Sequence, residues 1–288
     1  MRCMVLGGNG YLGRHLSLLI EKSGYELVLP KSKDGSRVDL VDKFAVSNLD
    51  WNVDLVFVFA GKTGTSIGFE RYENFVLGNE LILLNVLDSI RASRFSPRVI
   101  FPSTRLVYRG ADSPIAENGE VDIKTIYAAN KMCCENLLGV YNNAYGIDYT
   151  ILRICVPYAD VNGNEYSFGT VGSFIKQAKA NNKIRVYGDG AIYRTFTHVM
   201  DVVRFVFEAA ISDSTKNAVY NVPGENLSLY QIAESIAHKY AASVENVEWP
   251  DIDFRIETGS TMFDGSKLQN VLSISTEYSF YAWLDELY

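Results

Sequence analysis

Short apolar runs alternate with longer stretches of helical periodicity along the first two thirds of the chain. The run VDLVFVFA, at 53–60, is apolar at nearly every position, which is typical of a parallel strand covered on both faces. The longer stretches carry apolar residues three and four positions apart, as amphipathic helices do. The pattern predicts strands at Met1–Leu6, Tyr25–Leu29, Asp54–Ala60, Arg98–Pro102 and Tyr149–Ile154, and helices at Tyr11–Ser23, Glu70–Ser93 and Thr125–Tyr145.

After about Pro157 the pattern is looser. It predicts a strand at Ile184–Tyr187 and helices at Val171–Asn181, Asp201–Ser212 and Ser228–Tyr240. Alternating strands and helices joined by right-handed crossovers form a doubly wound parallel sheet, which binds its ligand at the carboxyl ends of the strands. We therefore expect an α/β protein with a sheet domain at 1–156 and a smaller C-terminal lobe, mainly at 157–288, some of whose segments return to the sheet.

Three glycines stand directly after the first apolar strand. Gly7, Gly10 and Gly13 fill the turn in LGGNGYLG, and an amphipathic helix follows. Glycine permits a sharp turn and a close approach of the backbone to a pyrophosphate, which the N–H groups of the helix N-terminus attract. A glycine trio alone can be only a turn, but the strand before it and the helix after it favour a dinucleotide-binding loop.

Composition narrows the class of protein further. The 288 residues carry a net charge of −7, which argues against a nucleic-acid partner. No apolar run approaches the ~20 residues of a membrane span, and no signal peptide precedes the first strand, so we expect a cytoplasmic protein. The four cysteines lack CxxC spacing and the three histidines are scattered, so we expect free thiols and no metal site.

Two further segments carry candidate chemistry. Tyr127 and Lys131 lie four residues apart on a predicted helix, so the phenol and the ammonium share one face. A nearby cation favours the phenolate and brings the pKa of tyrosine towards working pH. Ser103 and Thr104 end the strand IFPST, at the edge where the glycine turn also lies. Each feature has a simpler interpretation, a solvated helix face or a turn cap, but together they can hold and deprotonate a carbinol beside a nicotinamide.

In this order the segments resemble the extended branch of the short-chain dehydrogenase/reductase family, which contains nucleotide-sugar epimerases, dehydratases and reductases. Gly7–Gly13 matches the GxxGxxG loop of the family, and GDGAIYRTFTHVMDV, at Gly188–Val202, is similar to its GdG…R-x-[FY]-x-[HY]-V-x-D segment. The resemblance covers nearly the whole chain. It implies a Rossmann-type dinucleotide-binding domain at 1–156 and, mainly at 157–288, a nucleotide-sugar-binding lobe.

The resemblance also implies roles for individual residues. The catalytic residues would be Thr104, Tyr127 and Lys131, and the substrate would be contacted by Thr104, Arg105 and Arg194, with Arg194 on the nucleotide diphosphate. The cofactor would be contacted by the glycine loop, by segments that follow two later strands, by an Asn-led helix and by the catalytic segment. These residues are Gly7, Asn9, Gly10, Tyr11, Leu12, Gly13, Lys31, Asp39, Leu40, Ala60, Gly61, Lys62, Asn79, Ser103, Tyr127 and Lys131.

Three departures from the family pattern bear on the reaction. Arg105 and Leu106 stand where the dehydratases carry an Asp-Glu pair, which argues against a 4,6-dehydratase. The aspartate that usually ends the second strand is absent, and the chain continues as Pro30-Lys31-Ser32-Lys33. Lysine and serine there can pair with a 2′-phosphate, or the side chains of this turn can lie in solvent without binding a ligand. Val156 replaces a pyrophosphate-binding asparagine.

We therefore expect an enzyme that transfers a hydride between a nicotinamide cofactor and C4 of a nucleotide-diphosphate sugar. The leading interpretation is a 4-keto-sugar reductase, the alternative is a 4-epimerase similar to UDP-galactose 4-epimerases, and a non-catalytic dinucleotide-binding sensor is a third. The cofactor would be NAD or NADP, with a slight preference for NADP. The resemblance also implies a homodimer and a setting in surface polysaccharide synthesis.

Overall fold

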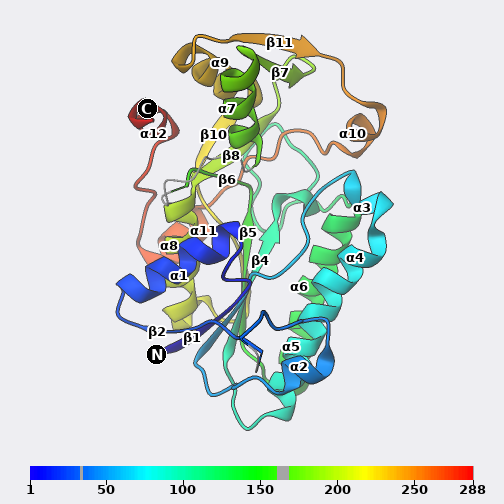
Figure 1. Ribbon diagram of the computed structural model, residues 1–288, viewed down its shortest axis with the longest axis vertical. Coiled ribbons are helices and arrows are strands. Elements are labelled where there is room, and N and C mark those ends of the chain that lie inside the picture. Colours follow the sequence, from blue (N-terminus) through cyan, green and yellow to red (C-terminus); the bar gives the residue numbers. More distant parts are fainter. Residues whose placement is uncertain (33–34, 161–168, 288) are drawn as a thin grey trace. The chain divides into compact units, whose positions relative to one another are not determined.

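The structure is a computed structural model that describes residues 1–32, 35–160 and 169–287 (Figure 1). Its internal contacts divide the chain into two compact units. The first comprises Met1–Val107, Ile123–Arg153 and Val203–Tyr220, and the second comprises Tyr108–Asp122, Ile154–Val202 and Asn221–Tyr288. Each unit is thus assembled from segments that lie far apart in the sequence.

A six-stranded sheet forms the centre of the first unit, in the order β2-β1-β3-β4-β5-β9. The β1–β2, β1–β3 and β3–β4 pairs are parallel. The strand order reverses beside β1, and in such sheets the ligand lies at the carboxyl ends of the strands at this point. The strands are β1 (Arg2–Leu6), β2 (Glu26–Val28), β3 (Leu55–Val58), β4 (Arg98–Thr104), β5 (Tyr149–Ile154) and β9 (Ala218–Asn221).

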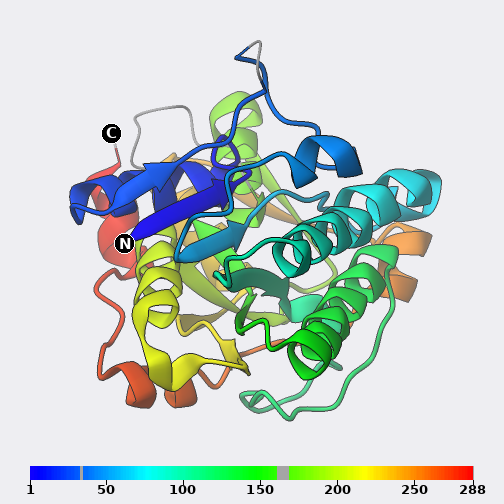
Figure 2. The ribbon, with the colours of Figure 1, turned by 90° about the horizontal axis from the view of Figure 1, so that it is seen from below.

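Helices cover both faces of this sheet. Figures 1 and 2 show α1 and α8 on one face and α5 and α6 on the other, and all four residues of β3 are buried between them. The expected Rossmann-type fold is confirmed. The helices are α1 (Tyr11–Lys22), α2 (Lys43–Ser47), α3 (Ile67–Glu70), α4 (Tyr72–Val76), η1 (Leu77–Leu81), α5 (Ile82–Ala92), η2 (Arg105–Val107), α6 (Ile126–Tyr145), α8 (Val199–Ile211) and η3 (Asp213–Thr215).

The single helix predicted at Glu70–Ser93 is divided in the structure. Its middle, Leu77–Leu81, is a π-helical segment between α4 and α5. A Cβ at Gly78 would lie 2.7 Å from Cγ of Lys62, and Asn79 Oδ1 accepts a hydrogen bond from Lys62 N. The wider π turn therefore lets the loop after β3 pack directly on the helix backbone, a contact that helical periodicity does not reveal.

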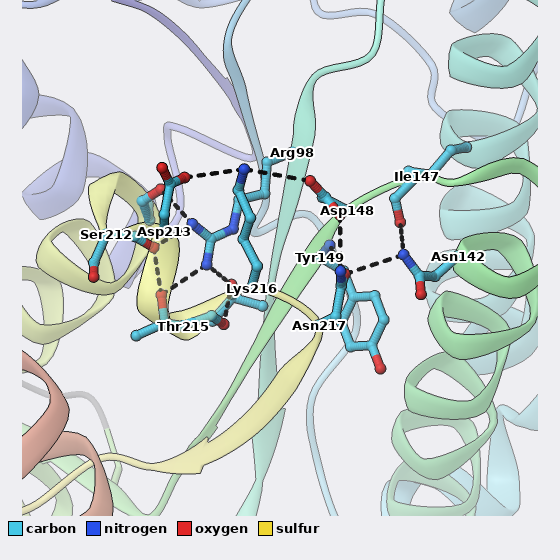
Figure 3. Close-up of polar contacts among 12 residues, drawn as sticks. Arg98, Asn142, Ile147, Asp148, Tyr149, Ser212, Asp213, Thr215, Lys216 and Asn217 are labelled. Carbon is cyan, nitrogen blue, oxygen red and sulfur yellow. Dashed lines mark hydrogen bonds and ion pairs between the residues drawn. The ribbon is translucent and has the colours of Figure 1, made fainter.

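A polar cluster lies at the amino ends of the central strands, where β4 begins (Figure 3). The buried guanidinium of Arg98 donates to Ser212 O at 2.6 Å and to Thr215 Oγ1 at 2.7 Å. Nearby, Lys216 Nζ lies 3.5 Å from Asp148 Oδ2. These contacts tie the connection between α8 and β9 to the starts of β4 and β5.

The second unit contains two small sheets, ordered β10-β8-β6 and β11-β7. Most of these strands are too short for sequence periodicity to reveal them. The strands are β6 (Val156–Tyr158), β7 (Lys183–Tyr187), β8 (Tyr193–His198), β10 (Glu225–Ser228) and β11 (Ser243–Val247), and the helices are α7 (Gly169–Asn181), α9 (Leu229–Lys239), α10 (Asp251–Ile256), α11 (Ser266–Leu272) and α12 (Phe280–Glu286). Among the described helices of the chain, none is both long and apolar enough to span a bilayer.

Candidate functional site

The turn between β1 and α1 depends on glycine at two positions. Gly7 has a φ of +90°, and a Cβ there would lie 2.4 Å from Ala60 N. A Cβ at Gly13 would lie 2.2 Å from Gly7 O. Both contacts are with backbone atoms that cannot rotate away, so larger residues would force the turn away from α1 and from the loop after β3.

This turn leaves the start of α1 open to a ligand. Gly10 N donates to Gly7 O at 2.9 Å, and Gly10 is the N-cap, with no side-chain hydrogen bond to the helix. No side-chain cap therefore stands between an anion and the first helical turn, where the helix dipole adds partial positive charge. This is the arrangement expected for a pyrophosphate-binding loop.

A cavity of about 480 Å³ adjoins the glycine turn, and every residue described around it belongs to the first unit. Of its described lining residues, two carry a positive charge, Arg37 and Lys62, and none carries a carboxylate. The combination of apolar walls, a helix N-terminus and two cations fits a dinucleotide with its phosphates. The lining residues are Val5, Leu6, Gly7, Gly8, Asn9, Gly10, Leu29, Pro30, Arg37, Val38, Leu40, Phe59, Ala60, Gly61, Lys62 and Ile82.

The residues expected to contact the cofactor fall into two groups. Those that line the cavity are Gly7, Asn9, Gly10, Leu40, Ala60, Gly61 and Lys62. Tyr11, Leu12 and Gly13 belong to the first turn of α1 and are not among its lining residues. Asp39 is not among them either, and its Oδ1 accepts from Val41 N at 3.0 Å. Asn79 acts on the cavity through its two hydrogen bonds with the backbone of Lys62.

The basic turn after β2 places one cation at the cavity, and it is not the expected one. Lys31 and Arg37 face each other as an antiparallel bridge, and Arg37 lines the cavity whereas Lys31 does not. Ser32 N donates to Ser36 O at 2.9 Å within this turn, and Lys33 lies outside the described residues. Sequence reasoning missed Arg37, although its position directly before Val38-Asp39-Leu40 was a usable signal.

The catalytic candidates meet where β4 ends against α6. Thr125 caps α6 and accepts from Ala128 N at 3.0 Å, so Tyr127 and Lys131 lie in the first two turns of the helix. Thr104 is the last residue of β4, and its side chain hydrogen-bonds with Tyr127. Lys131 Nζ donates to Pro102 O at 2.7 Å. The structure thus brings the three expected catalytic residues together.

Burial controls the protonation of this pair. It raises the pKa of Tyr127 to about 12, although the hydrogen bond with Thr104 lowers it, and it lowers the pKa of Lys131 to about 8. Lys131 Nζ lies 4.3 Å from the ring centroid of Phe101 and 5.9 Å from that of Tyr127. The expected lowering of the tyrosine pKa is therefore absent in this structure, and the phenol is protonated at neutral pH.

Ser103 belongs to a buried polar network next to the catalytic candidates. Its hydroxyl donates to Glu135 Oε1 in a short hydrogen bond. Arg153 holds the same carboxylate with two bonds, from Nε to Oε1 at 3.0 Å and from Nη2 to Oε2 at 2.6 Å. All three side chains are buried. Sequence reasoning missed Glu135 and Arg153, although Glu135 continues the i, i+4 series of Tyr127 and Lys131.

Arg194 lies on β8 of the second unit and is 2% exposed. Its Nη2 donates to Glu257 Oε1 at 2.6 Å, and its Nη1 donates to Tyr193 O and to Gly259 O. The guanidinium is therefore already oriented by protein groups. Arg105, the other basic residue expected at the substrate, lies in η2 directly after Thr104. In the described part of the chain, no cluster of His, Cys, Asp and Glu could hold a metal ion.

Comparison with known proteins agrees with this geometry. Residues 3–222 match the model of the NAD dependent epimerase/dehydratase family. The chain is 27% identical to a UDP-N-acetyl-alpha-D-glucosaminuronate decarboxylase of Bacillus cytotoxicus, over 86% of this chain and 83% of that protein. It superimposes with a TM-score of 0.85 on the UDP-glucose 4-epimerase of Thermus thermophilus in complex with NAD, at 22% identity, covering 99% of this chain and 96% of that one.

A UDP-glucuronic acid 4-epimerase from Bacillus cereus, in complex with UDP-glucuronic acid and NAD, gives a TM-score of 0.86 at 21% identity, covering 99% and 97% of the two chains. The chain belongs to the NAD dependent epimerase/dehydratase family. It is an enzyme of the extended short-chain dehydrogenase/reductase group. The resemblance inferred from the motifs is thereby confirmed.

Proposed function

We propose that this enzyme oxidises C4 of a nucleotide-diphosphate sugar and reduces it again from the other face, as a 4-epimerase. The observation that carries the proposal is the junction of β4 and α6, where Tyr127 is hydrogen-bonded with Thr104 and Lys131 lies one helical turn away. The similarity to two 4-epimerases of known structure supports the choice of epimerase over the reductase favoured by sequence alone.

In this proposal each residue of the junction has a separate task. Thr104 orients the C4 oxygen, and Tyr127 accepts or returns its proton. Lys131 supplies the positive charge that stabilises the phenolate while the proton is away. The phenol is protonated at neutral pH in the structure, which suits the return of a proton to a C4 ketone. Reductases and epimerases share this step.

A nicotinamide dinucleotide, when bound, supplies the hydride acceptor and donor for the reaction. The cavity at the glycine turn fits its pyrophosphate because of the dipole at the N-terminus of α1 and the charge of Lys62. We propose that Arg37 interacts with the adenosine ribose, since the cavity has no described carboxylate to accept hydrogen bonds from its hydroxyls. The positive charge of Arg37 can pair with a 2′-phosphate, which favours NADP as the cofactor. For this reason a 4-ketoreductase remains the second candidate function.

Arg194 is proposed to bind the substrate diphosphate. Its guanidinium is fixed by Glu257 and by backbone carbonyls, so that little conformational entropy is lost when the ligand binds. Arginine recognises phosphate oxygens with charge-assisted, often bidentate hydrogen bonds. Arg105 is the proposed second cation for the substrate.

A homodimer is proposed on the basis of exposed apolar side chains on neighbouring helical segments of the first unit. Tyr72, Val76 and Leu77 are 55%, 39% and 42% exposed on α4 and η1, and Val140 on α6 is 57% exposed. Helices α4 and α6 contact each other, so the exposed side chains of α4 and η1 lie beside the first turns of α6, and Val140 extends the exposed apolar surface further along that helix. Light scattering of wild type and of Tyr72→Glu with Leu77→Glu tests this: the wild type should have twice the mass of the chain, and the variant should be monomeric.

Turnover of a panel of nucleotide sugars tests the proposed reaction. The enzyme is incubated with NAD and, separately, with UDP-glucose, UDP-galactose, UDP-glucuronate and UDP-galacturonate, and the products are identified by ¹H NMR. The proposal predicts interconversion of one C4-epimeric pair with no net change in absorbance at 340 nm. Release of CO₂ would indicate a decarboxylase, and stoichiometric consumption of NADPH by a 4-keto sugar would indicate the reductase. Either result would replace the epimerase.

A further inference from the structure

Three consecutive residues at the end of β4 are bound to three residues that follow one another on a single face of α6. Pro102 O accepts from Lys131 Nζ at 2.7 Å, and Thr104 hydrogen-bonds with Tyr127. Between them, the hydroxyl of Ser103 donates to Glu135. The side chains at 127, 131 and 135 are spaced i, i+4, i+8, so they line up along the helix.

Glu135 is also anchored to a third element, the neighbouring strand β5. Arg153, at 5% exposure on β5, forms both an Nε–Oε1 and an Nη2–Oε2 bond with it. A carboxylate held by a planar guanidinium in this way has little freedom to move. Glu135 therefore fixes the position of Ser103 relative to β5. Because Thr104 is the next residue, its position is fixed as well.

We propose that Glu135 is a positioning residue for the acid–base pair, which aligns the end of β4 with Tyr127 and keeps Lys131 in its charged form. The inference rests on the proposed function, because it assumes that Tyr127 and Lys131 act on substrate or cofactor. Nothing in that function by itself requires a carboxylate one turn beyond the lysine.

The electrostatic part of the proposal follows from the groups around Lys131. Burial lowers the pKa of Lys131 to about 8, whereas Cys134 and, to a smaller extent, Glu135 raise it. Burial raises the pKa of the neighbouring Cys134 to about 12, so this thiol is neutral at working pH. Tyr127 is protonated as well, and β4 presents the carbonyl of Pro102 and the ring of Phe101, which carry no net charge.

Two other charged groups lie near this face. Arg153 on β5 is bound to Glu135 itself, and Glu80 on η1 is bound to Asn130 Nδ2 at 2.6 Å. Neither is among the causes of the shift in the pKa of Lys131, which are burial, Cys134 and Glu135. Glu135 is thus the carboxylate that offsets the cost of burying the ammonium, and Glu80 offers a matched control, since it is bound to the same helix.

The test measures the pKa of Lys131 directly in the full chain, by NMR of protein labelled with ¹³C at lysine Cε, with Lys131→Arg for assignment. Glu135→Gln should lower this pKa by about two units, the effect of removing a unit charge one helical turn (~6 Å) away at an effective dielectric near 20. Glu80→Gln should leave it unchanged. If Glu135→Gln fails to fold because Arg153 loses its partner, Glu135→Gln with Arg153→Met removes both charges and should lower this pKa by less, because a positive charge is lost together with the carboxylate.

The alignment is tested by Ser103→Ala, which breaks the link to β4 but keeps the charge of Glu135. This variant should lower kcat about tenfold, leave KM within twofold and leave the pKa of Lys131 unchanged. An unchanged pKa in Glu135→Gln, or an unchanged kcat in Ser103→Ala, would overturn the corresponding half of the proposal. The function fails separately, if Tyr127→Phe retains full turnover while Glu135→Gln still shifts the lysine.

Discussion

Removal of the Arg37 side chain tests how this enzyme distinguishes its two possible cofactors. Arg37 lines the cavity and is exposed, so its interaction with a ligand is attenuated by water. Two unit charges 4 Å apart in water attract each other by about 1 kcal/mol. A phosphate monoester carries ~1.5 to 2 charges, so contact with a 2′-phosphate should contribute about 1.5–2 kcal/mol, or ~10–30-fold in Kd.

We expect Arg37→Ala to weaken NADPH binding by this factor and to change NADH binding by less than threefold. Lys31→Ala is the matched control, since Lys31 is the bridge partner of Arg37 in the same turn but does not line the cavity. Dissociation constants from nucleotide fluorescence at 20 and 200 mM salt measure both effects, and the preference should diminish at the higher salt. The reasoning is refuted if Lys31→Ala changes the ratio and Arg37→Ala does not, or if wild type binds both nucleotides equally.

Four further predictions concern the catalytic junction, the glycine loop and the diphosphate. Tyr127→Phe should lower turnover by ~10²–10⁴ with cofactor binding retained, whereas Thr104→Ser should keep much of the activity; equal rates in wild type and Tyr127→Phe would contradict the mechanism. Gly13→Ala should abolish dinucleotide binding in a fluorescence titration, because its Cβ would lie 2.2 Å from a backbone oxygen, and wild-type affinity would refute that reason. Arg194→Ala should raise KM for the nucleotide sugar by ~10–100-fold with partial recovery in Arg194→Lys, and an unchanged KM would make this residue structural. Because the pKa of Lys131 is lowered to about 8, its charge is present below that pH and lost above it, so kcat should fall as pH rises through 8; a flat profile from pH 7 to 9 would count against the role of this ammonium.

Local patterns allowed five of the six strands of the sheet to be predicted from the sequence, and they singled out the three candidate catalytic residues, whose role stays a prediction. The strand, turn and helix around Gly7–Gly13 are adjacent in the chain, and the pair Tyr127 and Lys131 depends only on the helical repeat. These features need no knowledge of distant segments. The Rossmann-type fold and the family could be inferred from them for the same reason.

Several of the features that sequence reasoning missed depend on non-local packing. The π turn at Leu77–Leu81 arises where Lys62 packs on Gly78. The ion pair of Glu135 with Arg153 joins α6 to β5. The raised pKa of Tyr127 has the same origin, because the sequence shows the neighbouring lysine but not the burial that is the largest cause of the shift.

The measurement that most directly tests the central claim follows a deuterium atom placed at C4 of the nucleotide sugar found active. The substrate is incubated with enzyme and NAD in ordinary water, and the epimeric product is analysed by NMR and mass spectrometry. Hydride transfer to and from a bound cofactor predicts that deuterium remains at C4 of the product and that the labelled substrate turns over more slowly. It also predicts that Tyr127→Phe suppresses epimerisation at C4. Loss of the deuterium to solvent would contradict hydride transfer at C4.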